Sequence, residues 1–109
     1  MNEQTQLILS LLREVPLFSG LSVEELERLS DAFVLVELPK GETLYRAQEA
    51  TDGLFVVEAG QLGLLDDDGK QLEVLKRAEV IGTEALNYLP TREKSAVALS
   101  DAQVYFLPN

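Results

Sequence analysis

The residues with the clearest chemical potential lie between 80 and 97, where the sequence reads V-I-G-T-E-A-L-N-Y-L-P-T-R-E-K-S-A-V. Gly82 lets a ligand approach the backbone closely, because it has no Cβ. The N–H groups of residues 83–86 would lack partners at the start of a short helix, and Arg92 returns a positive charge from the far end of the loop. This combination predicts a binding site for an anion.

Missing residue types exclude most catalytic and metal sites. The 109 residues contain no cysteine and no histidine, so the chain offers no thiolate or imidazole for zinc, no disulfide and no histidine-based triad. Three consecutive aspartates precede Gly69, but a calcium loop needs its glycine sixth and not fourth. An enzyme built on carboxylates alone, from the 19 Asp and Glu, is the remaining catalytic alternative. We expect no metal site and no enzymatic activity.

Length and charge indicate one domain that acts away from nucleic acids and membranes. A hydrophobic content of 46% suits a folded core, and the formal net charge of −10 disfavours contact with phosphate backbones or an anionic membrane face. No apolar run is long enough to span a bilayer, and Glu3 precedes the first apolar stretch without any basic residue. We therefore expect a cytoplasmic domain.

The N-terminal part is expected to form two helices. Leucine and isoleucine recur at helical spacing over residues 4–14, and Pro16 ends that pattern. Ser22 followed by Glu25 is a capping box for a second helix over residues 23–32. The apolar face of the first helix either packs on its own domain or binds a partner.

From Phe33 onward the hydrophobic period changes from helical to two, which predicts strands. Glycine and proline turns separate them, and the Asp68-Gly69 pair predicts a hairpin. The expected strands cover residues 33–38, 43–45, 53–59, 61–65, 71–75, 95–99 and 103–107. This order predicts a mainly β fold, an antiparallel β-roll of the double-stranded β-helix or jelly-roll type over residues 33–109, preceded by a helical segment over residues 1–32.

The order of these motifs resembles the cyclic nucleotide-binding domain family of catabolite-activator-type regulators, kinase regulatory subunits and cyclic-nucleotide-gated channels. Val15-Pro16-Leu17-Phe18 is similar to the family's opening helix and turn, and Pro39-Lys40-Gly41-Glu42 to its early turn. Residues 52–60 resemble its central strand, and Ala98-Leu99-Ser100-Asp101 its late turn. The resemblance covers nearly the whole chain.

The resemblance also implies the ligand contacts. The family's cassette reads G-E-x-A-L, then a loop, then R-x-A-S/T-V, and aligned without a gap it places Arg92 on the phosphate-binding arginine and Ser95 on a hydroxyl that faces the ligand. The candidate ligand-binding residues are Gly82, Thr83, Glu84, Ala85, Leu86, Arg92, Lys94 and Ser95. The implied ligand is cyclic AMP, cyclic GMP or another small anion.

This cassette departs from the family at three positions. Thr83 replaces the glutamate that takes the ribose hydroxyl, and Lys94 and Ala96 replace an alanine and a valine. Loss of a charge-assisted hydrogen bond should weaken nucleotide binding by roughly 1.5–3 kcal/mol. Elsewhere, Gln48 and Ala78 occupy positions at which the family often carries turn glycines.

Three residues of the cassette have alternative interpretations. Glu84 lies one position after the family's glutamate, and bringing it inward would take a one-residue slip that breaks the glycine and alanine matches on either side. Arg92 also suits a surface arginine paired with Glu84 or Glu93, and Thr83 a helix N-cap.

Two functions are compatible with the sequence. The first is a regulatory sensor that binds a cyclic nucleotide or other small anion weakly under the helical turn at residues 82–88. The second is a degenerate module of the same fold that serves assembly or dimerisation through the N-terminal helix and the surface of the roll, with a homodimer through that helix as one such assembly. In the family, helices after the last strand transmit occupancy, and this chain stops at Asn109, so we expect a fragment of a longer protein.

Overall fold

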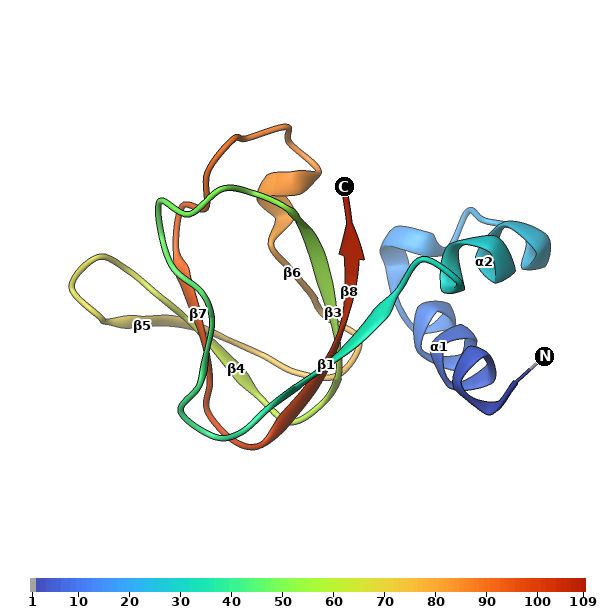
Figure 1. The fold of residues 1–109 in the computed structure, drawn as a ribbon, viewed down its shortest axis with the longest axis horizontal. Helices are drawn as coiled ribbons and strands as arrows, with labels where there is room; N and C mark the ends of the chain where they lie inside the picture. The colour runs from blue at the N-terminus through green and yellow to red at the C-terminus, as the bar shows by residue number, and fades with distance from the viewer. Residues whose placement is uncertain (1) are drawn as a thin grey trace.

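Two N-terminal helices precede eight strands in a computed structural model that describes residues 2–109. The strands form two four-stranded antiparallel sheets. In Figure 1 the helices lie to one side of the roll, next to the sheet that contains β1, β3 and β8. This arrangement confirms the predicted β-roll with two helices before it.

The helical segment matches the sequence prediction closely. Helix α1 covers Glu3–Arg13, a 3₁₀ turn η1 covers Pro16–Phe18, and α2 covers Val23–Ser30. The capping box of α2 is present, because the Ser22 hydroxyl accepts from the Glu25 N–H at 3.1 Å and the Glu25 carboxylate accepts from the Ser22 N–H at 3.0 Å. Neither α1 nor α2, the α-helices in the part of the chain that the structure describes, has the length and apolar content to cross a membrane.

Each sheet combines strands from distant parts of the sequence. The first has the order β1-β8-β3-β6 and the second β2-β7-β4-β5. The bounds of the first are β1 Val34–Leu38, β8 Ala102–Pro108, β3 Gly53–Ala59 and β6 Val80–Ile81. Those of the second are β2 Thr43–Tyr45, β7 Ser95–Ala98, β4 Leu62–Leu65 and β5 Gln71–Leu75.

Strand β3 separates two hydrophobic clusters, because successive side chains of a strand point to opposite faces. Leu54 and Val56 pack with α1 and α2, whereas Phe55 and Val57 face the interior of the roll. The N-terminal helix buries its apolar face in the first cluster through Ile8, Leu9, Leu11 and Leu12. That face therefore packs on its own domain.

Two turns adopt a backbone conformation that favours glycine. Gln48 and Ala78 have φ angles of 76° and 70°, in the left-handed region where an L side chain crowds the following carbonyl. These are the positions at which the resemblance to the family led us to expect glycine. The turn that contains Gln48 holds the backbone of Arg92 in place through two hydrogen bonds. The Gln48 N–H donates to the Arg92 carbonyl at 2.9 Å, and the Arg92 N–H donates to the Glu49 carbonyl at 2.8 Å.

Candidate functional site

The guanidinium of Arg92 lies inside the roll and not on its surface, with its side chain fully buried. Its Nη2 donates to Asp52 Oδ1 at 2.9 Å and to the Gly53 carbonyl at 2.7 Å. Its Nη1 donates to the Gly82 carbonyl at 3.3 Å and to Glu84 Oε1 at 3.4 Å. The alternative of a surface arginine is therefore wrong, although the expected pairing with Glu84 is confirmed.

Two aromatic rings lie against the guanidinium of Arg92. The Arg92 Cζ lies 4.4 Å from the ring centroid of Tyr45 and 5.7 Å from that of Phe55. A flat, delocalised guanidinium stacks on such faces, which helps to explain how a charged group is tolerated in the interior. Burial raises the pKa of the Tyr45 phenol, as does the nearby Glu84 charge, while Arg92 acts in the opposite direction. The phenol therefore stays neutral at physiological pH.

Glu84 points inward without the one-residue slip that the sequence analysis required. It is 8% exposed, and its second carboxylate oxygen accepts from the Glu93 N–H at 3.0 Å. The reason is the geometry of η2, a single 3₁₀ turn over Thr83–Ala85 in which each residue rotates by about 120°. Because Gly82 enters this turn with a φ of 84°, Thr83 faces solvent and Glu84 faces Arg92.

The helical start offers fewer free donors than predicted. The N–H groups of Ala85 and Leu86 already donate to the carbonyls of Gly82 and Thr83, so half of the expected anion-binding donors are occupied. The alternative interpretation of Thr83 as the N-cap of this turn is also wrong. Gly82 occupies that position, and no side chain caps the turn.

The remaining candidate residues lie in four different environments. Thr83 and Lys94 are exposed and line a cavity under η2. Ala85 packs against the helix-side cluster, and Leu86 is largely exposed. The Ser95 hydroxyl accepts from the Ala47 N–H at 2.9 Å, which ties β7 to the loop after β2.

The cavity under η2 measures about 230 Å³ and has an acidic lining. Its walls are Tyr45, Leu64, Glu73, Leu75, Val80, Ile81, Gly82, Thr83, Glu84, Glu93 and Lys94. Three carboxylates therefore face one ammonium, while Arg92 lies outside the lining. Within residues 2–109 no cluster of acidic side chains has an arrangement that could hold a metal ion.

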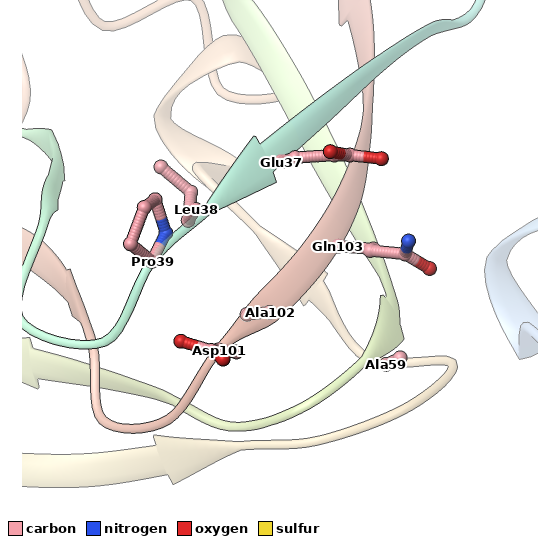
Figure 2. Close-up of a pocket in the computed structure, with 7 residues that line it drawn as sticks. All are labelled: Glu37, Leu38, Pro39, Ala59, Asp101, Ala102 and Gln103. Carbon is pink, nitrogen blue, oxygen red and sulfur yellow. The ribbon is translucent and has the colours of Figure 1, made fainter.

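A second cavity, of about 390 Å³, lies by the turns that follow β1 and precede β8 (Figure 2). Figure 2 shows Glu37 and Gln103 projecting to one side of these strands and Leu38 and Pro39 to the other. Asp101 at its edge accepts from the Lys40 N–H at 2.9 Å. Although larger, this cavity has two carboxylates and no cationic side chain in its lining, so it does not suit an anion.

Sequence reasoning missed two residues of the site, Asp52 and Tyr45. Asp52 stands 40 positions before Arg92, and it was interpreted only as the start of a strand motif. Tyr45 was assigned to a short strand without a role. The one available indication was that Asp52 begins a motif shared with the family, but the motif alone names no partner for its carboxylate.

A family model for the cyclic nucleotide-binding domain matches residues 35–109, which is more than half of the chain. The chain belongs to this family. Among solved structures, the N-terminal domain of a transcriptional regulator from Streptomyces coelicolor A3(2) is 30% identical with a TM-score of 0.81, and the match covers 90% of this chain and 73% of that one. The structure of cAMP-bound PfPKA-R is 28% identical with a TM-score of 0.86, over 99% of this chain and 40% of that one.

The chain is also similar to a further kinase regulatory subunit and to curated proteins of another name. The regulatory subunit of a cAMP-independent protein kinase A from Trypanosoma brucei has a TM-score of 0.87 and 23% identity, over 96% of this chain and 39% of that one, which shows the fold alone. Curated relatives are the uncharacterized NTE family proteins of Mycobacterium bovis and Mycobacterium tuberculosis, at 26% identity over 94 residues. The match covers 86% of this chain but only 16% of those proteins.

Proposed function

We propose that this cyclic nucleotide-binding domain is a regulatory sensor that binds cyclic AMP, cyclic GMP or another small anion only weakly, in the cavity under η2. The fold and the family support the regulatory role. The low affinity is inferred from the site itself. The cassette keeps Gly82 and Arg92. The terminal nitrogens of Arg92, however, already donate to oxygens of the protein and are not free for a phosphate.

The observation that carries this proposal is the engagement of both terminal nitrogens of Arg92. Both terminal nitrogens of its guanidinium already donate to protein oxygens, two of them carboxylate oxygens from Asp52 and Glu84. A phosphate can take the terminal nitrogens of this arginine only by displacing one of those acceptors. The phosphate would also have to enter a cavity whose charged side chains are three glutamates and one lysine. These like charges disfavour a bound anion.

The replacement at Thr83 lowers affinity further. In the family, as the sequence comparison implies, a glutamate at this position accepts from the ribose hydroxyl. Loss of the charge-assisted hydrogen bond to that carboxylate, which the shorter and neutral threonine hydroxyl does not replace, lowers the binding free energy by roughly 1.5–3 kcal/mol. That difference corresponds to roughly a tenfold to hundredfold loss of affinity. Together with the competition at Arg92, this leads us to expect dissociation constants near the millimolar range.

The test is a calorimetric titration of the 109-residue chain with cyclic AMP and cyclic GMP, in parallel with the variants Thr83→Glu and Thr83→Gln. We expect weak saturable heat in the natural chain and affinity at least about tenfold higher in Thr83→Glu. Thr83→Gln is the matched control, because it adds a side chain of similar size without the charge. Absence of binding up to millimolar ligand in both the natural chain and Thr83→Glu would refute nucleotide sensing.

The second candidate function is an assembly module, and one surface favours it. Leu86 and Leu89 are exposed, and Tyr88 is 94% exposed beside them. Tyr88 and Leu89, together with Asn109, line a cavity of about 550 Å³. The N-terminal helix is less available than the sequence suggested, because its apolar face is buried in its own domain. Sedimentation of the chain, and of Tyr88→Ser, across concentrations distinguishes a homodimer from a monomeric sensor.

A further inference from the structure

We infer that the Glu84 carboxylate is a tethered anion that occupies an anion seat of this domain. The anion seat is defined here by two donors, the Nη1 of Arg92 and the backbone N–H of Glu93. The inference deepens the proposed function and rests on it in one respect, since it names the residue that makes nucleotide binding weak. It concerns the seat itself and therefore applies to any small anion.

The two oxygens of one carboxylate each meet one donor of the seat. Glu84 Oε1 accepts from Arg92 Nη1 at 3.4 Å, and Glu84 Oε2 accepts from the Glu93 N–H at 3.0 Å. One charged and one backbone donor converging on a single anion is the pattern by which proteins bind carboxylates and phosphates. Here the anion belongs to the chain, eight residues before the arginine that it contacts.

The distances indicate which edge of the guanidinium can be exchanged. On the Nη2 edge, the contacts with Gly53 and Asp52 measure 2.7 and 2.9 Å. On the Nη1 edge, the contacts with Gly82 and Glu84 measure 3.3 and 3.4 Å. Shorter charge-assisted bonds are the stronger ones. The Nη2 edge is therefore held by the fold, whereas the Nη1 edge is the one that an incoming anion could take.

Glu84 also lies between the cavity and the arginine. Glu84 and Glu93 line the cavity under η2, while Arg92 lies outside that lining. An anion that enters the cavity consequently meets the carboxylate before it reaches the guanidinium. Occupation of the seat from within the chain needs no ligand and loses no translational freedom, which gives Glu84 the advantage of high effective concentration over a free competitor. Glu84 is thus a specificity-determining residue that keeps phosphates from Arg92.

The experiment uses the whole chain with Glu84 changed to alanine, and inorganic phosphate and cyclic AMP as probes in separate titrations. Glu84→Ala empties the seat while Arg92 retains Asp52 as its partner. We expect saturable phosphate binding to appear in this variant and its affinity for cyclic AMP to rise about tenfold or more. Phosphate should also raise the unfolding temperature of Glu84→Ala more than that of the natural chain, because a ligand that binds only the folded state stabilises it.

Glu73→Ala is the matched control. It removes the same charge from the same cavity lining but from a side chain that makes no hydrogen bond or ion pair with Arg92. We expect its anion affinity to stay near that of the natural chain. An equal gain in Glu73→Ala would overturn the inference, because the effect would then be one of cavity charge and not of the seat.

Glu84→Gln guards against a folding defect in the alanine variant. Its amide keeps the shape and can still accept from the Glu93 N–H, so we expect an anion affinity between those of the natural chain and Glu84→Ala. If both Glu84 variants fold, by circular dichroism, and bind phosphate no better than the natural chain, the inference is wrong. Failure of the natural chain to bind cyclic AMP speaks against the proposed function alone and leaves the phosphate result to decide this inference.

Discussion

Replacing Arg92 by methionine should destabilise the domain strongly, even with no ligand present. Methionine keeps most of the aliphatic stem and removes the charge and the donors. The side chain of Glu84 is only 10% exposed and would lose its cationic partner. Asp52, at 69% exposure, would return to water at little cost. The main penalty therefore comes from one buried carboxylate and from the carbonyls of Gly53 and Gly82.

The magnitude follows from these partners. Removing one member of a buried ion pair costs about 3–5 kcal/mol, because the other charge is left uncompensated. A domain of this size is stable by roughly 5–15 kcal/mol, so the loss is a large part of the total. The double variant Arg92→Met with Glu84→Gln removes both charges, and we expect it to recover about 2 kcal/mol of the loss.

Urea unfolding followed by circular dichroism measures these differences. Arg77→Met is the control, because Arg77 also bridges two carboxylates, Glu14 at 2.6 Å and Glu58 at 2.8 Å, but has a side chain that is 42% exposed. An exposed pair of this kind contributes about 0.2–1 kcal/mol. A loss of unfolding free energy in Arg92→Met no larger than that in Arg77→Met would refute the reasoning. It would mean that the Arg92 side chain is solvent-exposed and unpaired in solution. The expected loss also makes Arg92 variants poor controls for ligand binding.

Two further predictions concern the backbone that supports the site. Gln48→Gly should stabilise the domain by about 0.5–1 kcal/mol, because relief of a left-handed conformation gains more than the added freedom of the unfolded chain loses; a lower midpoint of thermal unfolding would contradict this. Gly82→Ala should destabilise it by about 2 kcal/mol or more, because the φ angle is 84° and the new Cβ would meet Arg92 Nη1 at 2.5 Å. Unchanged stability in urea would show that η2 and the guanidinium can move apart freely.

The fold was predictable because its determinants are local. Helical spacing before Pro16, the Ser22 and Glu25 capping box, and period-two strands separated by glycine turns all act over a few residues. Helix ends were less accurate. The second helix stops at Ser30, two residues earlier than predicted, because the N–H groups of Ala32 and Phe33 donate three residues back in a turn.

The site was predictable only in outline. The sequence placed the glycine, the short turn and the arginine of the cassette in the right order, and it identified Gln48 as occupying a glycine position. It brought Glu84 inward only through a one-residue slip, which the structure does not need. A single 3₁₀ turn has no repeating pattern from which its inward face can be read, and a left-handed Gly82 rotates the whole turn.

By itself, the sequence determined the β-roll, the two helices and the place of the cassette within the cyclic nucleotide-binding domain family, because periodicity, capping and turn residues act along the chain. Only the tertiary structure decided the partners of the arginine. Asp52 reaches Arg92 across 40 residues, and Glu84 reaches it by the rotation of one short turn. Contacts between segments so far apart depend on how the two sheets close on each other, and no local pattern encodes that closure.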